Sequence, residues 1–213
     1  MLYEIKSYAV APGQMPNCLS LYQDEGYRYF KPFEKNLLGY FVTEVGDLNR
    51  LVQFWKFEDY AERAAMLANQ VDALNVKRRS LTQQVVKGAE SMLLSRPDIA
   101  DSSVLVLSHE SWPAGVLGLA ASQLAEKYGK PALVIRSAKG ELARGSARSV
   151  EGVNVNALLS SHSHLLTQWG GHDMAAGFAL EASHIEDLRL ALSRAVRIQG
   201  APRKSDVLEV DIL

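Results

Sequence analysis

A pair of glycines followed directly by a histidine is the first feature of this sequence that could do chemistry, within residues 168–177, QWGGHDMAAG. An apolar-periodic segment stops just before it, so one glycine can end a helix in a left-handed cap and the other can admit a ligand or backbone. His172 then adds an imidazole donor to the backbone N–H groups around Gly170 and Gly171. This combination suits a phosphate group. The alternative is a helix end with an incidental histidine, because short glycine motifs recur by chance.

Two arginines on a predicted hairpin, residues 136–149, form a second candidate site. Arg144 and Arg148 are four residues apart, so on a strand both side chains face one side, about 13 Å apart. That separation is roughly two phosphates of an extended single strand. Gly145 and Ser146 beside them favour close approach of a ligand to the backbone. The alternative is a solvated hairpin edge.

His109, His172 as a metal ligand, and two tryptophans are weaker indications of a site. His109 follows the predicted strand 103–107 at its C-terminal end, the usual ligand edge of an open α/β sheet, although a plain loop position is the alternative. His172 alone is a weak metal ligand, because a metal site needs several converging ligands. We therefore predict no metal site and no catalytic residue in this chain by itself. Trp112 and Trp169 flank the glycine motifs, and each either stacks on a base or belongs to the core.

The elements that would position these residues form an α/β pattern. A strand at 103–107, a helix at 115–128 ended by Gly129, and a strand at 132–135 predict a β-α-β unit with parallel strands. The hairpin of the two arginines follows. The other predicted elements are a helix capped by Asn154 and running to residue 168, a strand at 176–180, a helix from 184 or 185 to 196, a linker at 200–204 and a strand at 207–213.

The first part of the chain has a different pattern. Its alternating and helical segments predict the order β-α-β-β, with strands at 2–10, 37–45 and 50–57 and a helix at 15–25. A helical run at 60–67 and a long helix at 71–94 follow, with a change of character near Asn69. The small sheet would have an uncovered edge that needs a partner strand.

Composition bounds the function. Apolar residues make up 47% and charged residues 22% of the chain, as in ordinary soluble globular proteins. The single Cys18 excludes an internal disulfide framework, and we find no secretory signal and no apolar run long enough to span a membrane. A cytoplasmic protein without a membrane partner is expected. The net charge of −1 excludes coating of nucleic acid by bulk electrostatics, so any such binding needs a local patch.

Four ordered motifs resemble the DHH-associated domain, the C-terminal half of RecJ-type single-strand exonucleases and related phosphoesterases. They are LNVKRR at 74–79, WPAGVLGLAAS at 112–122, GSARS at 145–149 and GGHDMAAG at 170–177. The resemblance implies a single-stranded nucleic acid or nucleotide ligand and places Arg148, the arginine of the GSxRS motif, in the substrate groove. In that family two manganese or similar ions are bound by a preceding DHH half. No DHH triplet occurs in this sequence, so we expect binding without hydrolysis unless a separate DHH half supplies manganese or magnesium in trans.

The first 67 residues resemble a truncated NIPSNAP domain of the dimeric ferredoxin-like class. The resemblance rests on YEIKSY at 3–8, PG at 12–13, LGYF at 38–41, EVGDLN at 44–49 and VQFW at 52–55. It implies a homodimer formed through the sheet.

The prediction as a whole is an α/β chain with a β-α-β-β ferredoxin-like piece at 1–70, a connecting helix and linker at 71–98, a mixed-sheet DHH-associated domain at 99–200 and a tail at 201–213. Its predicted ligand-binding residues are Arg148, His172, Gly170, Gly171, Arg144, Ser146 and His109. Three readings stay open: a nucleic-acid or nucleotide-binding module, the substrate-binding part of an exonuclease completed by a DHH partner, and a dimeric interaction protein. The sequence leaves undecided whether the ligand is DNA, RNA or a dinucleotide, and whether the join near Asn69 is natural.

Overall fold

The structure is a computed structural model that describes residues 1–44, 46 and 48–199. Its contacts divide the chain into two compact units, Met1–Lys77 and the residues from Arg78 onward, here called the N-terminal and C-terminal units. Val45, at the end of a predicted strand, and the predicted linker and strand beyond residue 200 lie outside the described residues.

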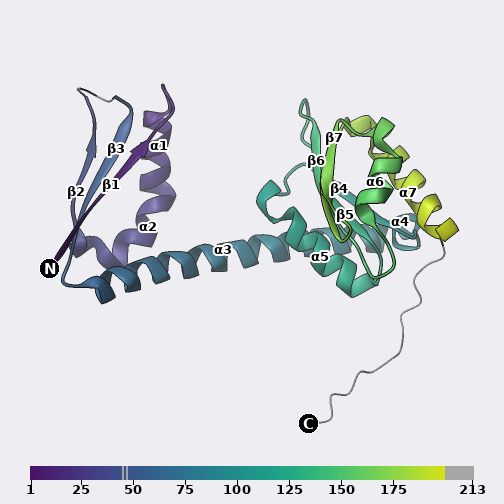
Figure 1. Cartoon of the computed structure of the whole chain (residues 1–213), viewed down its shortest axis with the longest axis horizontal. Helices are drawn as coiled ribbons and strands as arrows, with labels where there is room; N and C mark the ends of the chain where they lie inside the picture. The colour runs from purple at the N-terminus through teal and green to yellow at the C-terminus, as the bar shows by residue number, and fades with distance from the viewer. Residues whose placement is uncertain (45, 47, 200–213) are drawn as a thin grey trace, which may run out of the picture. The chain divides into compact units, whose positions relative to one another are not determined.

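The N-terminal unit is a three-stranded antiparallel sheet crossed by a helical run (Figure 1). Its strands β1 (Leu2–Ala9), β2 (Leu37–Val42) and β3 (Arg50–Phe57) take the order β1-β3-β2. This confirms the predicted β-α-β-β pattern. The connection between β1 and β2 consists of α1 (Met15–Leu21), the π-helical turn η1 (Tyr22–Gly26), α2 (Tyr27–Phe30) and the 3-10 segment η2 (Lys31–Asn36).

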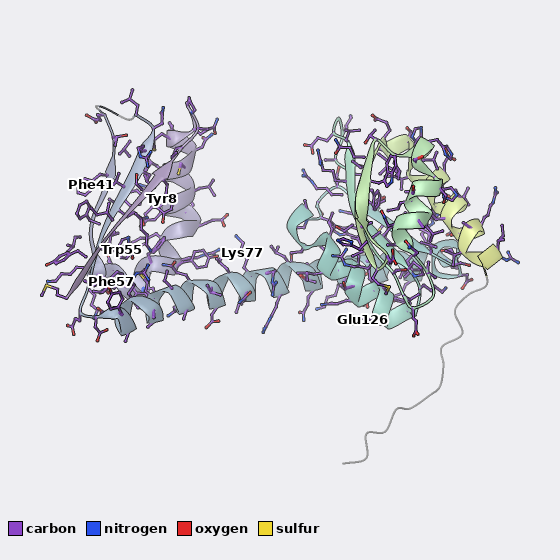
Figure 2. The ribbon with its side chains drawn as sticks, in the orientation of Figure 1. Tyr8, Phe41, Trp55, Phe57, Lys77 and Glu126 are labelled. Carbon is purple, nitrogen blue, oxygen red and sulfur yellow. The ribbon has the colours of Figure 1, made fainter. Side chains whose placement is uncertain are left out.

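The two faces of this small sheet differ because side chains alternate along each strand. On one face Trp55 and Phe57 are fully buried together with Met66. The other face carries Tyr3, Ile5, Phe41 and Phe54, all exposed, and we call these four residues the apolar sheet face. Phe41 and Tyr8 lie on opposite sides of the sheet, with Tyr8 toward the helical run (Figure 2).

A single helix, α3 (Tyr60–Ser95), replaces the two helices predicted at 60–67 and 71–94. The predicted change of character near Asn69 therefore falls inside continuous helix. The linking residues 67–70, LANQ, contain neither proline nor glycine, so nothing in them interrupts the hydrogen-bond ladder. Met66 belongs to the core of the N-terminal unit, and Val85 and Ala89 belong to a core of the C-terminal unit.

The C-terminal unit is built on a mixed five-stranded sheet of order β4-β5-β6-β8-β7. Its β4 and β5 are parallel and joined by α5 (Leu117–Tyr128), which Gly129 ends in a left-handed conformation, as predicted. The other pairs are antiparallel. The strands are β4 (Leu105–His109), β5 (Ala132–Arg136), β6 (Ala143–Arg148), β7 (Gln168–His172) and β8 (Ala175–Leu180). The shorter helices are α4 (Pro97–Ala100), α6 (Val155–Ser161) and α7 (Ile185–Gln199), with 3-10 turns η3 (Ala114–Val116), η4 (Ser163–Leu165) and η5 (Ala182–His184).

Helices cover the two faces of this sheet unequally (Figure 1). On one face α6 and α7 pack across the sheet in a core that includes Leu133, Phe178 and Leu180. On the other face α5 and residues 85–93 of α3 pack on β4 and β5. Helix α5 also lies against β6 on this face. Among the described residues, none from β6, β8 or β7 joins that second core, and β8 and β7 keep this face largely free of helix.

The prediction of a helix running from Asn154 to Gln168 and closed by the glycines is wrong. Asn154 does cap α6, its side-chain oxygen accepting from the N–H of Ala157 at 2.8 Å, but the helix ends at Ser161. The following residues form η4, and Gln168 then begins an edge strand. The cause is long-range pairing: the N–H of Thr167 donates to the carbonyl of Ala179 at 2.8 Å and opens the β7–β8 ladder. The glycines therefore lie in a β-hairpin.

Candidate nucleic-acid interface

The face of β6, β8 and β7 that lies opposite the core of α6 and α7 brings most of the predicted binding residues together. Directly opposite residues of antiparallel strands share a face, so the registers define three cross-strand rows. The rows are Arg148–Ala175–His172, Ser146–Gly177–Gly170 and Arg144–Ala179–Gln168. Five of the seven predicted ligand-binding residues stand among these nine positions. The nine carry two arginines and no carboxylate.

The middle column of these rows has small side chains only. It consists of Ala175, Gly177 and Ala179 of β8 and forms the floor of what we call the trough. A Cβ placed on Gly177 or on Gly170 would meet no atom within 4 Å, so the space above both is open. Strands lie about 4.8 Å apart and rows about 6.7 Å apart. The two polar columns are therefore about 10 Å apart, on either side of a floor about 13 Å long.

Arg148 is held against helix α5. Its Nη1 donates to the carbonyl of Ala147 at 2.8 Å, and its guanidinium lies beside Gly118, where an added Cβ would come within 2.6 Å of Nη2. The motif at 112–122 thus meets the motif at 145–149 at this contact. The sequence analysis did not single out Gly118. A glycine inside a helix lowers its stability by about 1 kcal/mol relative to alanine, so its presence there indicates close packing.

Arg144 is exposed at the other end of the same column. A shallow cavity of about 370 Å³ opens beside it. The cavity is lined by Arg144, Gly145, Gln168, Trp169, Gly177, Phe178 and Ala179. The trough therefore widens at its Arg144 end. Trp169 stands opposite Phe178, so its half-exposed indole belongs to the other face of the sheet.

The two glycines of the GGH stretch have different surroundings. Gly170 faces the trough, whereas Gly171 stands opposite Ala176 on the other face of the sheet. Gly171 has a φ of 156°, and a Cβ there would collide with the carbonyl oxygen of Ala175 and the Cα of Ala176. Gly171 thus permits close approach of β8, while Gly170 leaves space for a ligand. His172 is exposed at the end of β7.

His109 lies outside the trough. It is the last residue of β4, two strands away from Arg144 in the row His109–Arg136–Arg144. Its Nδ1 accepts from the N–H of Ser111 at 3.1 Å, and its ring centroid is 5.7 Å from that of Trp112. Trp112 itself is buried in the core against α3 and presents no free face for a base. The structure thus brings Arg144, Ser146, Arg148, Gly170 and His172 together and leaves His109 apart.

No group of three or more His, Cys, Asp or Glu residues suited to a metal ion occurs in the part of the chain that the structure describes. Neither His172 nor His109 therefore belongs to such a group in the described part. In the same described part, no helix is both long and apolar enough to cross a membrane. The chemistry that the trough itself offers is recognition of an anionic, extended ligand by guanidinium, hydroxyl and imidazole groups.

Two family models match different parts of the chain. Residues 101–197 match the family model described as DHHA1 domain, and residues 3–96 match the model described as NIPSNAP. The chain thus contains a RecJ-like DHHA1 segment and a NIPSNAP-like segment, as the motifs predicted. The NIPSNAP match runs to residue 96, well past residue 67, where the resemblance was expected to stop. It includes nearly all of α3.

Among its curated relatives is the single-stranded-DNA-specific exonuclease RecJ of Bacillus subtilis. The two are 36% identical over 154 residues, which cover 71% of this chain and 19% of that protein. The chain spans about a fifth of the length of the curated relative. Because 71% of 213 residues is about 151, the aligned part begins at or before residue 63. The RecJ-like and NIPSNAP-like similarities therefore overlap on α3.

Two solved structures are similar to parts of this chain. The crystal structure of Thermus thermophilus RecJ in complex with Mn²⁺ is 26% identical with a TM-score of 0.56, over 68% of this chain and 21% of that one. An uncharacterized NIPSNAP domain protein from Burkholderia xenovorans is 34% identical over 33% of this chain and 69% of that one, with a TM-score of 0.31.

Proposed function

We propose that the C-terminal unit binds a single-stranded nucleic acid, or a nucleotide, along the trough through its phosphate groups. The observation that carries this proposal is the column of small residues between Arg144, Ser146 and Arg148 on one side and Gly170 and His172 on the other. A strand lying on this floor meets positive charge at both ends of one wall. The relatives named as single-stranded-DNA-specific exonucleases support DNA as the first ligand to test.

The dimensions favour a single strand over a duplex. A floor bordered by columns about 10 Å apart accepts one sugar-phosphate chain, and the 13 Å between Arg144 and Arg148 corresponds to about two phosphates. Contacts to phosphate carry no base identity, so affinity should be nearly independent of base sequence. It should also fall steeply with salt, because each neutralised phosphate releases counterions.

We further propose that this chain binds without hydrolysing its ligand unless a separate DHH-containing half supplies a manganese or magnesium centre. A two-metal mechanism needs several carboxylates and imidazoles around two ions about 4 Å apart. The trough offers one imidazole and no carboxylate. The test is release of nucleotides from a labelled, 5′-phosphorylated single strand with manganese. Release by this chain alone, abolished in His172→Ala, would contradict the proposal; release only with an added DHH half would establish the trans-completed enzyme.

Binding is tested most directly by filling the trough. In Gly177→Leu the new side chain enters open space, so the sheet should fold normally while the floor is blocked. We expect fluorescence anisotropy with a short labelled single strand to show strong binding by the wild type and a large loss in this variant. Ala65→Leu, on the exposed surface of α3, adds an equally apolar side chain elsewhere and should bind normally. Equal affinity of Gly177→Leu and wild type would remove the trough from the site.

A second function, association of two copies through the N-terminal unit, is favoured by the apolar sheet face. Tyr3, Ile5 and Phe41 are each more than half exposed, and Phe54 stands between them on the central strand. Lys56, opposite Tyr3, and Arg50, opposite Ala9, lie on the same sheet face toward its two ends. The apolar residues between them can pair with a second copy in a two-fold contact, which places the same patch on both partners. Sedimentation should show a dimer that Phe54→Lys converts to monomer. A wild-type monomer at micromolar concentration would exclude this association.

A further inference from the structure

A small cavity lined by hydroxyl and guanidinium groups opens between α7 and the turn that precedes β4. Its volume is about 350 Å³. The helix packs on the sheet through Leu188, Leu192 and Val196, which belong to the core of the face opposite the trough (Figure 1). The cavity is lined by Asp101, Ser102 and Ser103 from the turn and by Arg189, Leu190, Ser193, Arg194 and Arg197 from α7. It is therefore distinct from the trough.

Helix periodicity explains how α7 presents these groups. Arg189, Ser193 and Arg197 are spaced four residues apart, so they form one stripe along the helix, and Arg194 lies beside it. The serine hydroxyl thus stands in the middle, with a guanidinium one turn before it and another one turn after it. This order places donors around a central point.

The Ser193 hydroxyl lacks a partner. Its Oγ is inaccessible to solvent and makes no hydrogen bond to any described residue, although a hydroxyl can donate once and accept twice. A buried hydroxyl without a hydrogen-bond partner is unfavourable. A ligand that accepts a hydrogen bond from it removes this cost, which favours binding. Ser102 differs, because its Oγ lies 2.7 Å from the carbonyl of Ile99 and 2.6 Å from that of Val104.

The charges around the cavity leave a positive excess. Arg189 contacts both carboxylate oxygens of Glu186 and lies 3.6 Å from Asp98, so its charge is offset. Arg194 and Arg197 are exposed and form no ion pair with any described residue. Asp101 is the one carboxylate among the described lining residues. Two available guanidinium groups thus face a single carboxylate.

We propose that this cavity binds a phosphate-class anion, with Arg194 and Arg197 supplying charge and N–H donors and Ser193 donating its hydroxyl proton to one oxygen. A tetrahedral oxyanion presents oxygens in several directions at once, which suits donors arriving from one helix at different heights. The ligand source is either free phosphate, including the phosphate end of a mononucleotide, or an internal phosphodiester of a strand. An acidic peptide, which offers planar carboxylates, is the competing occupant.

The experiment is calorimetric titration of the full chain, at constant ionic strength, with inorganic phosphate, a 5′-mononucleotide, a short strand without terminal phosphates and an acidic peptide. We expect saturable binding of inorganic phosphate that falls at least about tenfold in the double variant Arg194→Gln/Arg197→Gln. Lys87→Gln removes a positive charge from the exposed surface of α3, away from both sites, and should leave phosphate binding unchanged. The comparison uses only the binding that the double arginine variant removes, because a strand also binds the trough. If that component is tighter for the mononucleotide than for the unphosphorylated strand, the site takes free phosphate groups, and the reverse order assigns it to the phosphodiester.

A second variant separates ligand binding from folding. In Ser193→Ala the unpartnered hydroxyl is replaced by a better helix former, so thermal stability should be unchanged or higher while phosphate affinity falls about tenfold. Phosphate binding that survives in both Ser193→Ala and the double arginine variant would overturn the proposal. Tighter binding of the acidic peptide, lost in the same variants, would also overturn it.

Discussion

Each unit of this protein has a three-stranded antiparallel sheet with one face that helices leave largely open, and in the C-terminal unit α5 borders only β6 on that face, yet the two surfaces suit different partners. In the N-terminal unit the central strand β3 places Phe54 in the middle of the apolar sheet face. In the C-terminal unit the central strand β8 places Gly177 at the corresponding position. Both surfaces are three-stranded and antiparallel, so they differ mainly in the size of the side chains on the central strand. The large side chain of Phe54 fills one surface, and Gly177 leaves a trough in the other. Positive charge on the flanking strand β6 then favours the anionic ligand that we propose.

The largest effects are expected from substitutions at the two central residues, Gly177 and Phe54. Gly177→Leu should weaken single-strand binding by about 100-fold, or about 2.7 kcal/mol, because the strand can no longer lie on the floor. The same variant should keep the oligomeric state of the wild type.

Phe54→Lys should abolish dimers and leave strand binding intact. Loss of strand binding in Phe54→Lys would show that the two surfaces depend on each other.

Arg148→Ala tests whether this arginine contacts a phosphate of the bound strand. We expect about a tenfold loss of affinity at low salt, equal for all base sequences, because the contact is to phosphate. The slope of log affinity against log salt should decrease by about 0.7, the value for one phosphate of a single strand. Anisotropy titrations over a salt series measure both quantities. An unchanged slope would mean that Arg148 touches no phosphate.

Gly118→Ala should have a smaller effect, in which stability and binding change in opposite directions. The new methyl would push the Arg148 guanidinium away, giving about a threefold loss of binding, while alanine stabilises helix α5 by up to about 1 kcal/mol. Thermal unfolding and anisotropy on the same sample separate these effects. Adding Gly118→Ala to Arg148→Ala should cause no further loss of binding, since coupled residues are not additive.

The smallest expected effect concerns the N-terminal unit at acid pH. Arg63 donates to both carboxylate oxygens of Glu4, and this hydrogen bonding holds the pKa of Glu4 below its ordinary value of 4.5. A lowered folded-state pKa contributes stability above pH 4.5 that is lost as pH falls through the folded-state value. Glu4→Gln should therefore remove about 0.5 kcal/mol at neutral pH and flatten the dependence below pH 4.5.

Hydrogen exchange of the β1 and β3 amides between pH 3 and pH 7 would measure this effect. The exposed Glu58→Gln removes the same charge without this ion pair and should keep the wild-type profile. A wild-type profile in Glu4→Gln would show that the pair with Arg63 contributes nothing to folding.

Local pattern was sufficient to predict one wall of the trough and insufficient for the other. Arg144, Ser146 and Arg148 share a face because alternation along one strand is a local property. The positions of Gly170 and His172 depend on β8, which pairs with β6 on one side and β7 on the other. Nothing in residues 154–168 reveals that pairing, so their apolar spacing favoured a longer helix. The floor corresponds in the sequence to small residues at every second position, Ala175, Gly177 and Ala179. This spacing alone does not predict a trough.

The contact between Gly118 and Arg148 also constrains how this protein can change over evolutionary time. A methyl group at position 118 collides with the arginine, so alanine is costly to binding there only while position 148 carries a long side chain. A lineage that shortened residue 148 would be released from glycine at 118 and would gain helix stability by replacing it. Return to arginine at 148 would then restore only part of the binding until position 118 reverted. The two positions should therefore vary together, and the order of their substitutions should be hard to reverse.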